Sequence, residues 1–259
     1  YNTFKGNIFT EHGNKYEDIS IMFYEHMYNT KIEEFGCLKH DKYKFLGASP
    51  DGINVDPESL RYGRMLEIKN PTSRELTGIP KEDYWIQMQL QMETCNLNEC
   101  DFLETSFKEY ENEEEFNNDG TFTYTANNEL KGIIVYFIKN EKQFYEYMPI
   151  KITKAEYTKW YDKILELHSN LTWVKNIYWK VEKISCVLVL RNKTWFNNAI
   201  SKIGEVWDII NTERVTGYEH RMPKNPKKSC SKPLDNSNEH LNNIDDNCLI
   251  NICTLQNQI

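Results

Sequence analysis

Residues 47–69 read GASPDGINVDPESLRYGRMLEIK, and this stretch decides how the rest of the chain is interpreted. Its first part places Asp51 in a Ser-Pro-Asp-Gly sequence, which is typical of a tight turn. Its last part, at residues 65–68, is a short apolar run that predicts a buried strand. The sequence therefore predicts an acidic turn close to a buried strand.

The predicted strand carries two charged side chains at alternate positions. Alternate side chains of a strand share a face, so Glu67 and Lys69 point to the same side, roughly 6 to 7 Å apart. Leu66 and Ile68 then point to the other side, toward the core. One face of this strand is therefore expected to present an acid and a lysine together.

Two carboxylates beside a lysine match the requirements of phosphodiester hydrolysis. Asp51, Glu67 and the backbone carbonyl of Ile68 are hard oxygen ligands of the kind that Mg²⁺ prefers. Lys69 can orient or deprotonate the attacking water, provided that the site lowers the lysine pKa. Taken alone, however, the pattern is more often an ordinary hairpin with an exposed Glu and Lys on one face.

Four sequence blocks in a fixed order favour the nuclease interpretation over an ordinary hairpin. They read HGNKYE at residues 12–17, LGASPDG at 46–52, LEIKNPTSR at 66–74 and YWIQMQ at 84–89. Together they resemble the PD-(D/E)XK nucleases, and within them the YqaJ-type viral recombinases of the phage lambda exonuclease family. The sequence of these blocks is most similar to copies of the family carried by large DNA viruses.

The resemblance implies a fold, a reaction and a set of site residues. The fold is an α/β restriction-endonuclease-like core, with a mixed central sheet flanked by helices. The reaction is 5′ to 3′ digestion of duplex DNA ends with Mg²⁺ or Mn²⁺, leaving single strands for an annealing protein. The implied catalytic residues are Glu17, Asp51, Glu67, Lys69 and Gln87; the metal ligands are Asp51, Glu67, Ile68 and Glu17; the DNA contacts are Arg74, Ser49, Thr72, Ser73 and Tyr84.

Two other functions stay open at this stage. A structure-selective or nicking endonuclease could use the same fold, and a non-catalytic DNA-binding module could retain the motif. The family pattern also includes an Arg-containing segment upstream of the first helix, which this sequence does not show. The direction of digestion and the preferred end are therefore open, as is a homo-oligomeric state.

Composition bounds these alternatives. The 259 residues can form one main core, and the net charge of −8 argues against a protein that coats nucleic acid non-specifically. No run of about 18 apolar residues predicts a membrane span, and no secretory leader is recognisable. Seven widely spaced cysteines without a C-x-x-C pair favour a reducing compartment, namely host cytoplasm, viral factory or nucleus, and no iron-sulfur cluster.

The remaining pattern predicts the element order. We expect a nuclease core at residues 1–150, a helical extension packed on it at 151–222 and a disordered tail at 223–259. The expected helices are 10–30, 81–95, 153–168, 173–179 and 195–210; the expected strands are 99–107, 132–138 and 143–149, with a hairpin of 33–38 and 43–46 and an acidic loop at 109–119.

Overall fold

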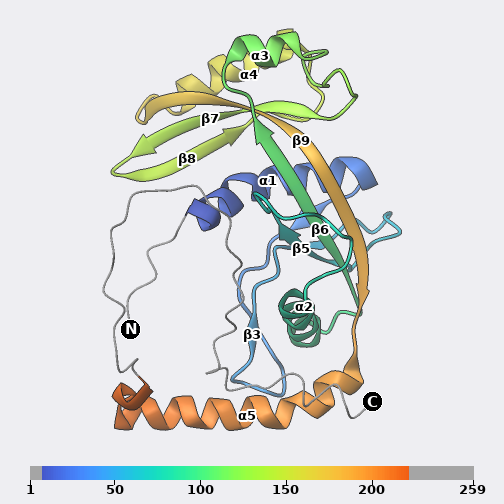
Figure 1. Ribbon diagram of the computed structural model, residues 1–259, viewed down its shortest axis with the longest axis vertical. Helices are drawn as coiled ribbons and strands as arrows, with labels where there is room; N and C mark the ends of the chain where they lie inside the picture. The colour runs from blue at the N-terminus through green and yellow to red at the C-terminus, as the bar shows by residue number, and fades with distance from the viewer. Residues whose placement is uncertain (1–7, 222–259) are drawn as a thin grey trace, which may run out of the picture. The chain divides into compact units, whose positions relative to one another are not determined.

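The computed structural model describes residues 8–221, which form two compact units that divide between Arg191 and Asn192. The first unit contains a seven-stranded mixed sheet (Figure 1). Its strands, in spatial order, are β1 (Ile32–Glu33), β4 (Gly52–Asn54), β5 (Met65–Lys69), β6 (Glu99–Glu109), β9 (Thr172–Leu190), β7 (Lys131–Lys139) and β8 (Lys142–Tyr147).

Only β5 and β6 run parallel; the other neighbours in the sheet are antiparallel. A parallel pair needs a crossover, and helix α2 (Glu82–Cys95) supplies it. Helix α1 (Ile8–Tyr28) covers the opposite face of the same strands. The predicted α/β class, a mixed sheet flanked by helices, is confirmed.

Both faces of β5 are buried because each carries a helix. On one face Met65 packs with Met88 and Met92 of α2, and on the other Leu66 packs with Tyr24 of α1. Leu66 and Ile68 face the core as predicted, but the face that carries Glu67 is covered as well. A carboxylate on this strand must therefore find partners inside the protein.

The far end of the sheet carries its own helices. Helix α3 (Glu113–Asn118) and helix α4 (Lys154–Leu167) pack on one face of β7, through Phe116 on Ile133 and through Ile164 on Phe137. Tyr16 and Ile19 of α1 pack on its other face. A separate two-stranded sheet joins β2 (Leu38–Lys39) to β3 (Gly47–Ala48).

The second unit begins at Asn192. It contains helix α5 (Lys193–Thr216) and the short 3-10 helix η1 (Glu219–Arg221). The Asn192 side chain caps α5 by accepting a hydrogen bond from the Trp195 backbone N–H. Across the residues from 8 to 221, no helix is long and apolar enough to cross a membrane.

Three predicted elements are wrong. Residues 173–179 are not a helix but part of β9, where Ile177, Trp179 and Val181 alternate onto the buried face. The first compact unit consequently extends to Arg191, past the expected end of the core at residue 150. The acidic run is not a plain loop, because Asn112 caps α3 by accepting from Glu115 N–H and the first turn of α3 is acidic.

The predicted hairpin has different strands. Strand β1 pairs with β4, and the hairpin itself forms between β2 and β3, so residues 33–38 do not pair with 43–46. The expected tail at 223–259 lies outside the described residues.

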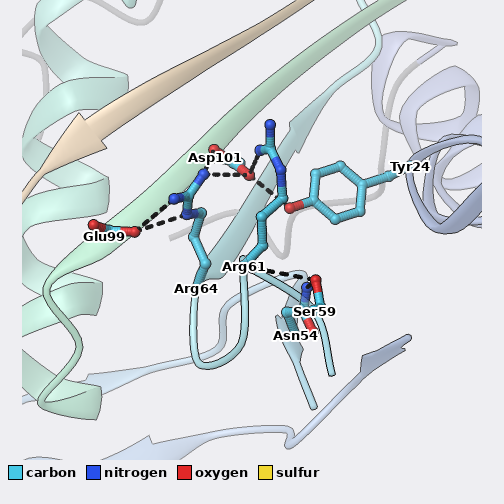
Figure 2. Close-up of polar contacts among 7 residues, drawn as sticks. All are labelled: Tyr24, Asn54, Ser59, Arg61, Arg64, Glu99 and Asp101. Atoms are coloured by element: carbon cyan, nitrogen blue, oxygen red, sulfur yellow. Dashed lines mark hydrogen bonds and ion pairs between the residues drawn. The ribbon is translucent and has the colours of Figure 1, made fainter. Parts of the chain in front are cut away.

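The loop at residues 55–64, between β4 and β5, is held to the sheet by one buried carboxylate. Asp101 of β6 is 1% exposed and forms ion pairs with Arg61 and Arg64, both from this loop (Figure 2). The Tyr24 hydroxyl of α1 donates to the same carboxylate at 2.6 Å. These contacts hold Arg64, the residue before β5, and so anchor the start of the strand. Lys69 lies at the other end of β5.

Removing this charge should destabilise the fold. Asp101→Asn removes the ion-pair partner of Arg61 and one of the two ion-pair partners of Arg64, and we expect the free energy of unfolding to fall by about 3 kcal/mol in urea titrations. Glu99→Gln is the control, because the Glu99 side chain also pairs with Arg64 but is 43% exposed. Its cost should stay below about 1 kcal/mol, and equal costs for the two variants would contradict the role of Asp101.

Candidate active site

The pairing of β4 with β5 stops at the predicted acidic turn. The paired residues are Ile53 with Met65 and Gly52 with Leu66. Asp51 is the next residue in this register and lies opposite Glu67, but the two do not form a strand pair. Instead, the Asp51 carboxylate accepts a hydrogen bond from the Ile68 backbone N–H at 2.6 Å. The two acids are thereby brought to the same end of β5.

Gly52 lets this arrangement form. A Cβ atom at this position would lie 2.2 Å from the Cγ2 atom of Ile32, a buried side chain on neighbouring β1. The glycine of the Asp-Gly pair is therefore required for close packing of β4 against β1, in addition to its value as a turn residue.

Glu67 is fully buried, and three side chains bind its carboxylate. Lys69 and Gln87 donate to Oε1, the glutamine at 2.7 Å, and Gln91 donates to Oε2 at 2.9 Å. Gln87 and Gln91 lie one helical turn apart on α2, so both amides face the strand. These two glutamines of α2 therefore hydrogen-bond a buried carboxylate and do not face the solvent.

A cavity of about 430 Å³ opens beside these residues. Most of the predicted site residues line it, together with four that were not predicted: its walls are Gly13, Asn14, Glu17, Asp51, Ile68, Lys69, Asn70, Pro71, Thr72, Ser73, Arg74 and Tyr84. Three predicted residues are not in the walls. Glu67 and Gln87 lie behind Lys69, and Ser49 is exposed, with its backbone carbonyl 3.5 Å from the Gln91 amide.

Asn70 is a cavity residue that the sequence interpretation missed. It directly follows Lys69, accepts a hydrogen bond from the Ser20 hydroxyl at 2.8 Å and donates to the Gly13 carbonyl at 3.3 Å. These two contacts attach α1 to the end of β5 on both sides of Glu17. The Glu17 side chain is thus placed in the cavity by a residue from another element.

The acids and Lys69 influence one another's protonation. Burial, and then the nearby charge of Glu67, raises the pKa of Asp51 to about 7. Burial and the neighbouring Asp18 also raise the pKa of Glu17. Burial opposes the charge of Lys69, but the Glu67 carboxylate outweighs it, so the pKa of Lys69 is raised.

The raised pKa favours one of the two predicted roles of Lys69, that of a charged donor. A general base needs a lysine pKa that is lowered toward neutrality, and the site does the opposite. Lys69 is therefore a charged donor that can orient water or stabilise negative charge.

The donor set suits a small divalent cation. Asp51, Glu67 and the Ile68 carbonyl supply hard oxygens, and the pKa of Asp51 is raised first by its burial and then by the nearby charge of Glu67. Within residues 8–221, no group of three or more His, Cys, Asp or Glu side chains has the spacing of a metal cluster. A cation here would be held by two carboxylates and backbone oxygen, with Glu17 in support.

Residues 1–98 match the YqaJ-like viral recombinase domain. The resemblance predicted from the four sequence blocks is confirmed. The matched segment includes Glu17, Asp51, Glu67, Lys69 and Gln87, the five predicted catalytic residues.

An uncharacterized protein of Acanthamoeba polyphaga mimivirus is 34% identical over an alignment of 242 residues, and the match covers 80% of this chain and 44% of that protein. The chain therefore spans less than half the length of this viral relative. The predicted similarity to copies in large DNA viruses agrees with this match.

Two solved structures of an alkaline exonuclease from Laribacter hongkongensis were also compared. The first is 19% identical with a TM-score of 0.35, covering 64% of this chain and 70% of that one. The second, a complex with dAMP, is 20% identical with a TM-score of 0.34, covering 64% and 71%. TM-scores of this size support no conclusion about activity.

The raised pKa of Asp51 predicts a pH dependence of stability without metal. In the folded chain this carboxyl binds its proton more tightly than at its ordinary pKa of 3.8, so the folded state is relatively favoured at low pH. That contribution is lost as the pH rises from about 4 through about 7. With a chelator present, Asp51→Asn should consequently be more stable than the parent chain at pH 8 and not at pH 4.

Thermal unfolding across this pH range measures the difference. Asp41→Asn is the matched control, because Asp41 is exposed and outside the cavity, and its profile should follow that of the parent chain. An Asp51→Asn profile parallel to both would refute the raised pKa of Asp51.

Proposed function

We propose that this chain is a metal-dependent deoxyribonuclease that digests double-stranded DNA from its ends in the 5′ to 3′ direction. The observation that carries the proposal is the convergence of Asp51 and Glu67 where β4 and β5 part, with Lys69 on the same strand and a cavity beside them. The match of residues 1–98 to viral recombinase domains supports a DNA substrate.

The proposed metal site uses oxygen atoms of the two carboxylates and of the strand backbone. Asp51, Glu67 and the Ile68 carbonyl would hold Mg²⁺ or Mn²⁺, with Glu17 assisting directly or through water. A cation bound there supplies an acidified water and neutralises charge on the phosphate. Gln87 and Gln91 keep the Glu67 carboxylate in place.

Lys69 acts as a donor in this proposal. Its ammonium group is held by Glu67 and lines the cavity, where it can hydrogen-bond the attacking water or a phosphate oxygen. Its raised pKa favours the protonated form, in which it donates hydrogen bonds.

The other side of the cavity is suited to a DNA backbone. Thr72, Ser73 and Arg74 follow the strand in a loop whose side chains line the cavity, and Tyr84 forms the wall between Lys69 and Arg74. Hydroxyl and guanidinium donors of this kind bind phosphate. Ser49 lies outside the walls, so we propose for it only a contact with DNA that extends beyond the cavity.

The match to viral recombinase domains supports a proposed biological setting. We propose a role in recombination, repair or replication of viral DNA inside the host cell, with a single-strand annealing protein as a partner for the product strand. Ring-shaped or other homo-oligomers are compatible with this proposal, and a net charge of −8 makes contact at the site more important than general attraction to DNA.

Replacing Lys69 with Ala should abolish cutting; it costs stability because Glu67 loses its ion pair, but Glu67 keeps both glutamine partners and the chain should still fold. The assay is digestion of a linear duplex labelled at one 5′ end, with Mg²⁺ or with chelator. We expect a rate loss of at least about 100-fold, the size of effect that follows removal of one transition-state donor. Lys108→Ala is the control, because Lys108 is exposed on β6 and does not line the cavity.

The products separate this function from its two alternatives. Release of the label as short fragments indicates 5′ to 3′ digestion, whereas nicking of covalently closed circles indicates an endonuclease. Duplex binding without any Mg²⁺-dependent cutting identifies a non-catalytic module, and normal cutting by Lys69→Ala refutes the assigned site.

Metal binding can be tested without DNA. At pH 8, Mg²⁺ or Mn²⁺ should raise the Tm of the parent chain, because a ligand that binds only the folded state stabilises it. The rise should be lost in Glu67→Ala and kept in Glu99→Gln, whose residue is on β6 and faces Arg64. A Tm rise that Glu67→Ala retains would exclude this residue as a ligand.

A further inference from the structure

A second fully buried carboxylate lies directly behind the cavity. Glu104 of β6 is 0% exposed and is the parallel register partner of Lys69. Its Oε1 atom forms an ion pair with the Arg74 guanidinium, whereas its own side chain does not line the cavity. Glu104 can therefore affect a substrate only through the residues in front of it.

Arg74 needs such support because its backbone is irregular. It lies between β5 and α2, in a stretch without helix or strand, and only 23% of its side chain is exposed. One nitrogen, Nη2, binds Glu104, and the side chain lines the cavity. A guanidinium has five N–H donors, so this anchor leaves donors for a second anion.

Tyr84 confines the same guanidinium from a second direction. The centre of its ring is 5.5 Å from the Arg74 Cζ atom and 5.2 Å from the Lys69 ammonium. The ring is itself packed 5.9 Å from Phe102, the neighbour of Glu104 two positions along β6. Lys69 and Arg74, the two cations of the cavity wall, thus both lie close to the Tyr84 ring. Each is paired with a buried glutamate.

Glu104 is not fully satisfied by these contacts. Its second oxygen, Oε2, is buried and makes no hydrogen bond within the described part of the chain. An unsatisfied buried carboxylate oxygen costs stability, and an apolar side chain at the same place would avoid this cost. Stability alone therefore does not account for a glutamate here.

We propose that Glu104 is a positioning residue that fixes the Arg74 guanidinium in the cavity wall so that it can bind a phosphate of the DNA backbone. This inference rests on the proposed nuclease function. Glu104 does not touch the phosphate; it orders a loop arginine before the substrate arrives, which lowers the entropy lost on binding.

The sign of one substitution separates this role from simple electrostatics. Glu104→Gln removes a negative charge from a site that binds an anion, so a charge effect alone would make DNA bind more tightly. If Glu104 positions Arg74, the same substitution weakens binding. The two explanations predict opposite changes.

The experiment is a double-mutant cycle on DNA affinity with chelator present, so that no cutting occurs. Affinity for a labelled duplex is measured over a range of salt concentrations for the parent chain, Arg74→Ala, Glu104→Gln and the double variant. Arg74→Ala should bind about fivefold more weakly at 0.15 M salt, with a salt slope smaller by about 1, because one phosphate contact is lost. Glu104→Gln should lose roughly two- to fivefold, and the double variant should bind no more weakly than Arg74→Ala.

Glu99→Gln is the matched control. Glu99 is also on β6 and also pairs with an arginine, but Arg64 lies in the loop at residues 55–64 and not in the cavity. Its DNA affinity should equal that of the parent chain. If Glu104→Gln does not fold at the assay temperature, Glu104→Leu replaces the buried charge with an apolar side chain and should show the same loss of affinity.

The outcomes distinguish two failures. Tighter binding by Glu104→Gln, unchanged binding, or a loss that adds fully to that of Arg74→Ala overturns the positioning role while the parent chain still binds and cuts DNA. A parent chain that neither binds nor cuts duplex DNA overturns the proposed function, and this inference with it.

Discussion

The structure depends on how a fully buried carboxylate, Glu67, is stabilised in a central strand. A charge with no exposed surface is strongly unfavourable unless it is paired and hydrogen-bonded. Lys69 supplies the opposite charge from the same strand, and Gln87 and Gln91 supply two amides from α2. The crossover helix that the parallel pair requires is thus also the source of the hydrogen bonds that make the acid tolerable.

The same constraint explains why the second acid lies where the ladder ends. If β4 continued to pair with β5, the Ile68 N–H would be available to a backbone carbonyl and not to the Asp51 side chain. Because the pairing of the two strands ends at Gly52 and Leu66, the Asp51 carboxylate accepts from the Ile68 N–H. It then lies close enough to Glu67 for the two charges to repel. The folded chain therefore carries an electrostatic cost in this place that a cation would relieve.

The sequence was informative wherever a contact follows from local spacing. The period of two in β5 placed Glu67 and Lys69 on one face of the strand, and the family resemblance singled out Gln87, which binds Glu67. Glu104 and Asn70 were missed because their roles come from partners about 30 to 57 residues away, which no local pattern encodes. The aromatic residues at 173–179 were assigned a helix because their spacing is ambiguous, and pairing with β6 and β7 decides for a strand.

An acidic chain can hold a DNA backbone if its cations are fixed where they are needed. A net charge of −8 provides no general attraction to a polyanion. The cavity wall compensates locally: Lys69 and Arg74 both lie close to the Tyr84 ring, and they pair with Glu67 and Glu104 on adjacent strands. Such pairing lowers the net positive charge of the wall but fixes its geometry. If the chain is the proposed nuclease, its affinity for DNA would depend on the fit of a phosphate between ordered donors and not on the field of the whole protein.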